Sequence, residues 1–256
     1  MTVSPAEAPK RGPMTAPTPT APPAPVTSRY ATGERQRADD TPRALLLDLD
    51  GVLLDTRPVM EKAWHEVQVA HGLDMPFASY ERHLGREFSD IMRRLGVRDA
   101  ELVFETYESA SRGASHLAQQ FVGMAEVLHA FAAADWRLGV VTSKPLDRAA
   151  PLLAQLGCPF ATIRTPDSAG RAKPAPDPIL LALIDLGIDP SAATYVGDMS
   201  VDQEAAARAG VAYIHAGWGY GQPTSPLPET VASPQELLQL LQSAGPSEPS
   251  AAGSLV

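Results

Sequence analysis

Cysteine, long apolar runs and positive charge are all scarce in this 256-residue sequence. A single cysteine excludes an internal disulfide framework, so we expect a reducing, cytoplasmic setting. No apolar run approaches the roughly 18–20 residues that cross a bilayer, and the first thirty residues lack the apolar stretch of a secretory signal. Thirty Asp and Glu against 21 Lys and Arg give a net charge of -9. This acidity argues against a protein that wraps nucleic acid or binds an anionic membrane.

Proline, in contrast, is abundant and unevenly placed. Nine of the 25 prolines lie within residues 1–42, where Ala, Thr and Ser fill most of the space between them. Such a segment cannot bury enough apolar surface to offset its ordering entropy. We therefore predict a disordered leader over residues 1–42, with a docking segment for a proline-reading partner as the alternative. Residues 243–256 have a similar composition and predict a disordered tail.

Short apolar runs alternate with helical patterns over residues 43–242. The runs that predict strands are Ala44–Asp48, Leu138–Thr142, Cys158–Ile163, Thr194–Gly197 and Val211–Ile214. The helical patterns between and after them are Met124–Ala134, Leu146–Leu156, Pro178–Leu186, Val201–Ala209 and Gln235–Gln242. Strands that alternate with helices predict an α/β fold, with a doubly wound, Rossmann-like parallel sheet covered by helices on both faces.

The stretch after the first strand breaks this alternation. It contains helical patterns without a good strand between them, at Val59–Ala70, Phe88–Leu95 and Ala100–Leu117. We predict that residues 57–120 form an inserted helical cap domain. The α/β core then comprises residues 43–56 and 121–242.

Polar residues gather where the predicted strands end, which is where ligands bind in an open parallel sheet. The residues at the strand ends are Asp48, Asp50, Thr142, Ser143, Asp198 and Asp202. Lys173, in a loop ahead of a helix, is expected at the same edge of the sheet. Clustered carboxylates repel one another and become stable around a hard cation, usually Mg²⁺. A lysine and a hydroxyl group beside that cation would bind the oxygens of a phosphoryl group.

Each of these features is common by itself, as a strand end, a helix cap or a loop lysine. Their order is more specific: Asp-x-Asp-Gly-Val, Thr-Ser, Lys-Pro-x-Pro and Gly-Asp-x-x-x-Asp. This order resembles the haloacid dehalogenase superfamily, and within it the phosphoglycolate phosphatase and β-phosphoglucomutase-like branch with a helical cap. The resemblance implies a phosphoric monoester hydrolase that depends on Mg²⁺, acts on a small phosphorylated metabolite and forms an aspartyl-phosphate.

The resemblance also implies roles for the residues that match its motifs. Asp48 would be the nucleophile and Asp50 the general acid and base. Phosphate binding would fall to Thr142, Ser143 and Lys173. The metal would be held by Asp48, the backbone carbonyl of Asp50 and Asp198, with Asp202 in support. In the cap, Arg86 lies in a Gly-containing turn and is the candidate for substrate specificity, since its guanidinium can fork onto an anion.

Several alternatives remain. Mutases of this branch carry a histidine where this chain has Met60, which favours hydrolysis. Dehalogenases of the superfamily lack the equivalent of Asp50, and non-enzymatic phospho-receiver modules are about half as long and have no cap. The motifs fit phosphoglycolate-like compounds and sugar phosphates alike. Residues Thr142–Pro166 and Gly197–Gly221 are also similar to phosphatases of ansamycin-type aminohydroxybenzoate biosynthesis, which suggests an amino-sugar or related substrate from secondary metabolism.

Overall fold

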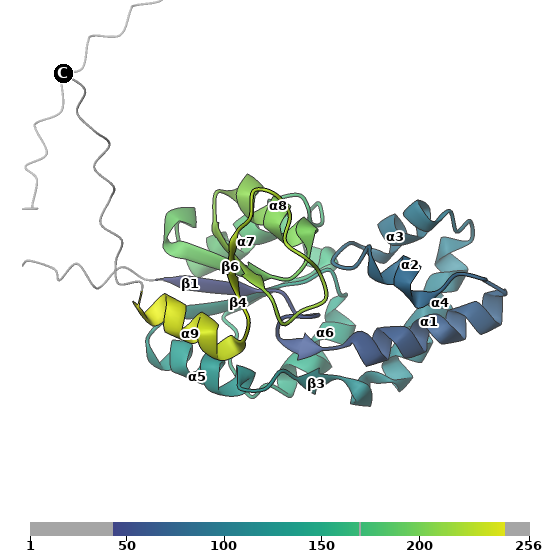
Figure 1. Cartoon of the computed structure of the whole chain (residues 1–256), viewed down its shortest axis with the longest axis horizontal. Helices are drawn as coiled ribbons and strands as arrows, with labels where there is room; N and C mark the ends of the chain where they lie inside the picture. Colours follow the sequence, from purple (N-terminus) through teal and green to yellow (C-terminus); the bar gives the residue numbers. More distant parts are fainter. Residues whose placement is uncertain (1–42, 169, 244–256) are drawn as a thin grey trace, which may run out of the picture. The chain divides into compact units, whose positions relative to one another are not determined.

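A computed structural model describes residues 43–168 and 170–243 (Figure 1). The predicted leader therefore lies outside the described residues, as does the predicted tail except for its first residue, Ser243, which ends the last helix. Within the described ranges, no helix is both long and apolar enough to span a membrane.

A parallel sheet of six strands forms the centre of the described chain, in the order β5-β4-β1-β6-β7-β8. The strands are β1 (Ala44–Leu47), β4 (Arg137–Val141), β5 (Thr162–Arg164), β6 (Ala193–Gly197), β7 (Ala212–Ala216) and β8 (Glu229–Val231). The predicted α/β fold with a parallel sheet is confirmed. Strand β5 begins four residues later than predicted, beyond Pro159, which cannot donate a ladder hydrogen bond.

Both faces of the sheet are covered by helices. Alternate residues of β1 point to opposite sides, and since all of them are apolar and buried, both sides need a covering layer. Leu45 and Leu47 belong to a hydrophobic cluster with α5 (Met124–Ala133), α6 (Leu146–Ala154) and α9 (Pro234–Ser243). Ala44 and Leu46 belong to a second cluster with α7 (Asp177–Leu186) and α8 (Ser200–Ala209). Figure 1 shows α7 and α8 on the opposite side of the strands from α5 and α9. Two short 3₁₀ helices, η2 (Pro166–Ser168) and η3 (Pro190–Ala192), lie in the connecting loops.

The chain between β2 (Leu54–Asp55) and β3 (Gln119–Gln120) is helical, and these two short strands pair antiparallel at its base. We call its helices the cap helices: α1 (Arg57–His71), α2 (Phe77–Glu81), α3 (Phe88–Leu95), α4 (Ala100–Gly113) and the 3₁₀ helix η1 (Ser115–Leu117). They have a hydrophobic cluster of their own, which includes Trp64, Tyr80 and Tyr107. The division of the chain into core and cap at residues 57 and 120 stays a prediction.

Candidate active site

The site lies where the winding of the sheet reverses. From β1 the chain runs outward through β4 and β5, and it then returns to β6 on the other side of β1. A crevice at the carboxyl ends of the strands is expected at such a switch point. Asp48 follows β1 and Asp198 follows β6, so the strand order brings these two carboxylates together.

Asp48 is almost fully buried, at 3% exposure, and its carboxylate faces a lysine. Its Oδ2 lies 2.9 Å from Nζ of Lys173, and its Oδ1 accepts a hydrogen bond from the backbone N–H of Leu49 at 2.7 Å. Burial raises the pKa of Asp48 to about 7, although the positive charge of Lys173 acts in the opposite direction. A cation beside Asp48 would therefore favour its ionised, nucleophilic form.

Lys173 connects Asp48 to a second carboxylate. Its Nζ donates to Oδ1 of Asp202 at 2.7 Å and to the hydroxyl oxygen of Tyr195 at 3.2 Å. Asp202 also accepts the backbone N–H of Met199 through Oδ2, at 3.0 Å. Burial alone would lower the pKa of Lys173, but Asp202 and Asp48 raise it above its usual value. The lysine is thus held as a buried ammonium between two carboxylates.

Asp198 completes the buried group and has an oxygen without a partner. Its Oδ2 accepts the backbone N–H of Tyr220 at 2.7 Å, while its buried Oδ1 has no hydrogen-bond partner. Burial, reinforced by Asp202 and Asp48, raises the pKa of Asp198 well above its usual range. Gly51 has a φ of +81°, and a Cβ there would lie 2.3 Å from Oδ2 of Asp198. Only glycine lets the loop after β1 come this close to the carboxylate.

Three carboxylates among the described residues can meet at one cation. Oxygen atoms of Asp48, Asp198 and Asp202 lie within 4.8 Å of one another. Within the described part of the chain, the ammonium of Lys173 pairs with two of these buried carboxylates, Asp48 and Asp202, so the cluster carries uncompensated negative charge. The orphaned Oδ1 of Asp198 and the all-oxygen donor set both fit a hard divalent cation such as Mg²⁺.

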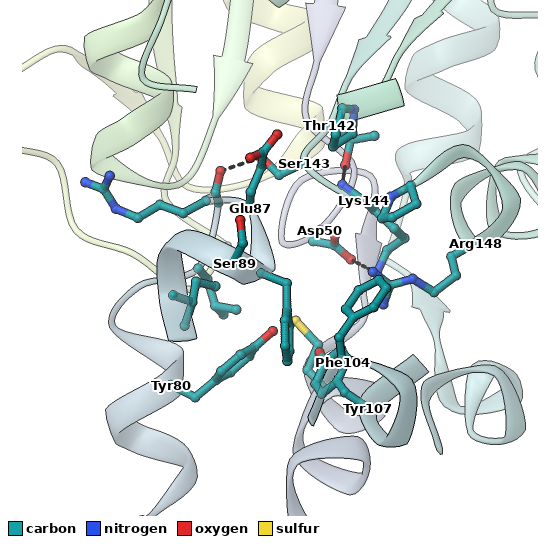
Figure 2. A pocket seen from close by; sticks show the side chains of 18 of the residues that line it. Asp50, Tyr80, Glu87, Ser89, Phe104, Tyr107, Thr142, Ser143, Lys144 and Arg148 are labelled. Carbon is teal, nitrogen blue, oxygen red and sulfur yellow. Dashed lines mark hydrogen bonds and ion pairs between the residues drawn. The ribbon is translucent and has the colours of Figure 1, made fainter. Parts of the chain in front are cut away.

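A cavity of about 310 Å³ lies over Asp48, lined by the core and the cap helices. Asp50 lines it, and its Oδ1 accepts the Thr56 hydroxyl at 2.5 Å and lies 3.0 Å from Nζ of Lys144. Figure 2 shows Asp50 and Lys144 in contact, with their ion pair drawn as a dashed line. Thr142 also lines the cavity, and its Oγ1 accepts the backbone N–H of Lys144 at 3.1 Å. The cavity therefore begins at the predicted nucleophile and passes the predicted acid and base.

Two further predicted residues lie at the boundary with the cap helices. The Ser143 hydroxyl donates to the backbone carbonyl of Gly85 at 2.6 Å, so it joins the core to the cap turn. Arg86 lines the cavity, and its Nη1 lies 3.2 Å from Oδ2 of Asp90. All the predicted site residues are thus either in the buried carboxylate cluster or on the wall of the cavity.

Three residues that the sequence interpretation did not assign also hold this site together. Lys144 and Thr56 both contact Asp50. The Tyr220 hydroxyl accepts the backbone N–H of Thr56 at 2.7 Å and donates to Oδ1 of Asp55 at 2.9 Å. Lys144 follows Thr142 and Ser143 directly, and this position is the signal in the sequence that it supports the site. Tyr220 lies 164 residues from Thr56, and its glycine-rich surroundings carry no signal for this contact.

Residues 45–216 match the family described as haloacid dehalogenase-like hydrolase. The chain belongs to the haloacid dehalogenase-like hydrolase family. An N-acetylmuramic acid 6-phosphate phosphatase of Pseudomonas aeruginosa is 33% identical to this hydrolase over 71% of this chain and 84% of that protein. A plasmid-encoded phosphoglycolate phosphatase of Cupriavidus necator is 31% identical over 72% of this chain and 84% of its own length.

Solved structures agree with this membership at the level of the fold. A hydrolase from Pseudomonas syringae superposes with a TM-score of 0.72 and 23% identity, covering 79% of this chain and 99% of that one. The family predicted from the four motifs is confirmed. The relatives named as phosphatases agree with the expected class of phosphoric monoester hydrolases.

Proposed function

We propose that this hydrolase is a Mg²⁺-dependent phosphatase that cleaves a small phosphomonoester through an aspartyl-phosphate on Asp48. The observation that carries the proposal is the position of Asp48. Its carboxylate is buried beside Lys173, forms a cluster with Asp198 and Asp202, and lies at the floor of a cavity that Asp50 lines. The named phosphatase relatives support the same reaction class. We further propose that the chain belongs to the phosphoglycolate phosphatase-like branch of the family and acts in the cytoplasm.

Asp48, Asp198 and the backbone carbonyl of Asp50 are the proposed holders of Mg²⁺, and Asp202 supports them. When bound, the cation supplies positive charge that offsets the negative charge of the phosphoryl oxygens and of the clustered carboxylates. Lys173 adds a fixed positive charge next to Asp48, and Thr142 provides a hydroxyl group for the phosphoryl oxygens. The Ser143 hydroxyl would bind them after its single proton leaves the backbone carbonyl of Gly85.

In the first step, an oxygen of Asp48 attacks phosphorus and the bond to the leaving oxygen breaks. Asp50 donates its proton to that oxygen, so the leaving group departs as a neutral alcohol. In the second step, Asp50 takes a proton from water as the water oxygen attacks phosphorus. This attack breaks the bond to Asp48 and releases inorganic phosphate. The contacts of Asp50 with Thr56 and Lys144 fix the position of its carboxyl group for both steps.

Hydrolysis is favoured over transfer between sugar hydroxyl groups by Met60. This residue is buried and lines the cavity, and its thioether is at best a weak hydrogen-bond acceptor that cannot hold the Asp50 carboxyl group. The mutase reaction and a role with amino-sugar phosphates of secondary metabolism remain the alternatives, whereas membership of the hydrolase family argues against the non-enzymatic phospho-receiver module. Residues 57–120 are proposed to act as a cap domain that excludes water from the site, with Arg86 selecting the substrate.

Phosphate release from a panel of small phosphomonoesters tests the proposal. We expect turnover with Mg²⁺, none in chelator, and a loss of at least about 1,000-fold in kcat for Asp48→Asn, because the amide is a poor nucleophile. Asp135→Asn is the matched control, since Asp135 is exposed and lies outside the cavity. Retained turnover in Asp48→Asn would contradict the nucleophile. Stable phosphorylation of the protein without release of phosphate would contradict the proposed hydrolysis step.

A further inference from the structure

The cap side of the cavity is a continuous aromatic wall. Tyr80, Phe88, Phe104 and Tyr107 all line it, and we call these four residues the aromatic wall. The ring centroid of Phe88 lies 5.2 Å from that of Phe104 and 5.0 Å from that of Tyr107, within the range of favourable ring contacts. In Figure 2 the rings of Tyr80, Phe104 and Tyr107 lie below Asp50 and Lys144, and all five residues line the same cavity.

Apolar side chains extend this wall. Met60 and Ile91 from the cap helices and Leu84 from the turn between α2 and α3 line the same cavity. A phosphoryl group bound at Asp48 would leave most of this surface uncovered if its leaving group were a two-carbon acid. The space of about 310 Å³ is at the lower end of the range for small-molecule sites, enough for one ring beside the phosphoryl group.

The cations on the cavity wall already face carboxylates of the protein. Their pairs are Lys144 with Asp50 at 3.0 Å, Arg148 with Glu108 at 2.6 Å and Arg86 with Asp90 at 3.2 Å. A leaving group with its own carboxylate would have to compete with these internal partners. Glu87 and Glu101 also line the cavity, and neither forms an ion pair within the described part of the chain. Local charge thus gives little advantage to an acidic leaving group.

We propose that the natural leaving group is an uncharged alcohol with an apolar or aromatic ring, which packs against the aromatic wall, and that Phe104 determines the preference for this ring. The inference rests on the proposed phosphatase function and names the substrate class of the same site. Burial of the ring face against Phe88 and Phe104 would stabilise the bound ester by removing apolar surface from water.

Three alkyl phosphates distinguish the effect of a ring in the leaving group from the effect of its charge. They are benzyl phosphate, ethyl phosphate and 2-phosphoglycolate. Their alcohols are of similar basicity, so differences in kcat/KM report on the cavity. We expect benzyl phosphate to exceed both others by at least about tenfold. Phe104→Ala should reduce the benzyl-to-ethyl ratio of kcat/KM by about tenfold, chiefly through KM. Phe104→Leu, which keeps an apolar side chain and the fold, should reduce it by a smaller factor.

Leu102→Ala is the matched control, because Leu102 lies on the same helix, is 56% exposed and does not line the cavity. It should keep the wild-type ratio. The inference is overturned if 2-phosphoglycolate or ethyl phosphate is the better substrate, or if the Phe104 variants lose activity on all three esters equally. Either result would leave the phosphatase function standing. Absence of turnover on every ester would instead overturn the proposed function, and the inference with it.

Discussion

At the scale of single residues, the site contains more buried carboxylates than positively charged groups to pair with them. Lys173 touches both Asp48 and Asp202, so its single ammonium serves two carboxylates, while Asp198 keeps an oxygen without a partner. Asp50 is different, because it is partly exposed to the cavity and held by two donors, the Thr56 hydroxyl and Lys144. The site therefore has a buried part that holds the attacking carboxylate and a more open part for proton transfer.

Thr56→Val tests the support of Asp50. The substitution removes the hydroxyl that donates to Oδ1 of Asp50, so we expect kcat to fall by about tenfold, because a hydrogen bond to a charged group contributes about 1.5–3 kcal/mol. Phosphate-release kinetics over a range of pH measure the effect, and thermal unfolding checks the fold. Thr230→Val removes an exposed hydroxyl elsewhere and should keep the wild-type kcat. An unchanged kcat in Thr56→Val would contradict this role.

At the scale of elements, pairs of polar residues connect the edge of the sheet to its helices. Strand β5 is short and lies at one edge, next to β4. Its residues Thr162 and Arg164 both donate to Asp185 on α7, with the Thr162 hydroxyl at 2.5 Å and Nε of Arg164 at 2.8 Å. This carboxylate therefore ties the helix to the edge strand.

Asp185→Asn should destabilise the protein in a pH-dependent way. Hydrogen bonds from Arg164 and then Thr162 lower the pKa of Asp185 in the folded protein. A lowered pKa contributes stability above the unfolded value of about 3.9, and this stability is lost as pH falls through the folded value. We expect a loss of about 1 kcal/mol at pH 7 that disappears in strong acid.

Denaturant unfolding of the wild type and Asp185→Asn at several pH values measures this difference. Asp74→Asn, at an exposed position on the cap, should unfold like the wild type at every pH. A loss of stability in Asp185→Asn that is constant from neutral to acidic pH would show that packing, rather than charge, is responsible.

At the scale of the whole molecule, the two hydrophobic clusters on the faces of the sheet stabilise the folded state, whereas repulsion within the carboxylate cluster destabilises it. Leu45 and Leu47 pack on one face and Leu46 on the other, so the strand before the site is buried on both sides. The same strand delivers Asp48 to a rim where Asp198 and Asp202 add further negative charge. A bound cation should relieve this repulsion and stabilise the folded state.

Thermal unfolding with Mg²⁺ and with chelator tests that expectation without any turnover. Mg²⁺ at 100 times its dissociation constant should stabilise the wild type by about 2.7 kcal/mol and raise its Tm. Asp198→Asn should lose most of this shift in Tm. The carboxylate of Asp198 has an oxygen without a partner, and the substitution replaces this carboxylate by a neutral amide. Potassium chloride at equal ionic strength is the control. An equal shift in wild type and variant would contradict a site at Asp198.

The sequence predicted much of the fold, and for physical reasons. The short uninterrupted apolar run of β1 is typical of a strand buried on both faces, and the spacing of strands and helices then implies a parallel sheet. Strand β8 was not predicted, because Glu229–Val231 is short, polar on two of three residues and preceded by prolines. Helix α2 was missed as well, since five residues do not establish a helical period.

For the site as well, some features could be predicted from local sequence patterns and others depend on tertiary contacts. The sequence by itself determined which carboxylates follow the strands, because a parallel sheet gathers its strand ends on one rim. Only the tertiary structure decided which ammonium each carboxylate faces: Lys173 with Asp48, and Lys144 with Asp50. It also decided that Phe88 and Phe104 face the cavity. Those contacts join segments far apart in the chain, and side-chain packing across such distances has no periodic signature in the sequence.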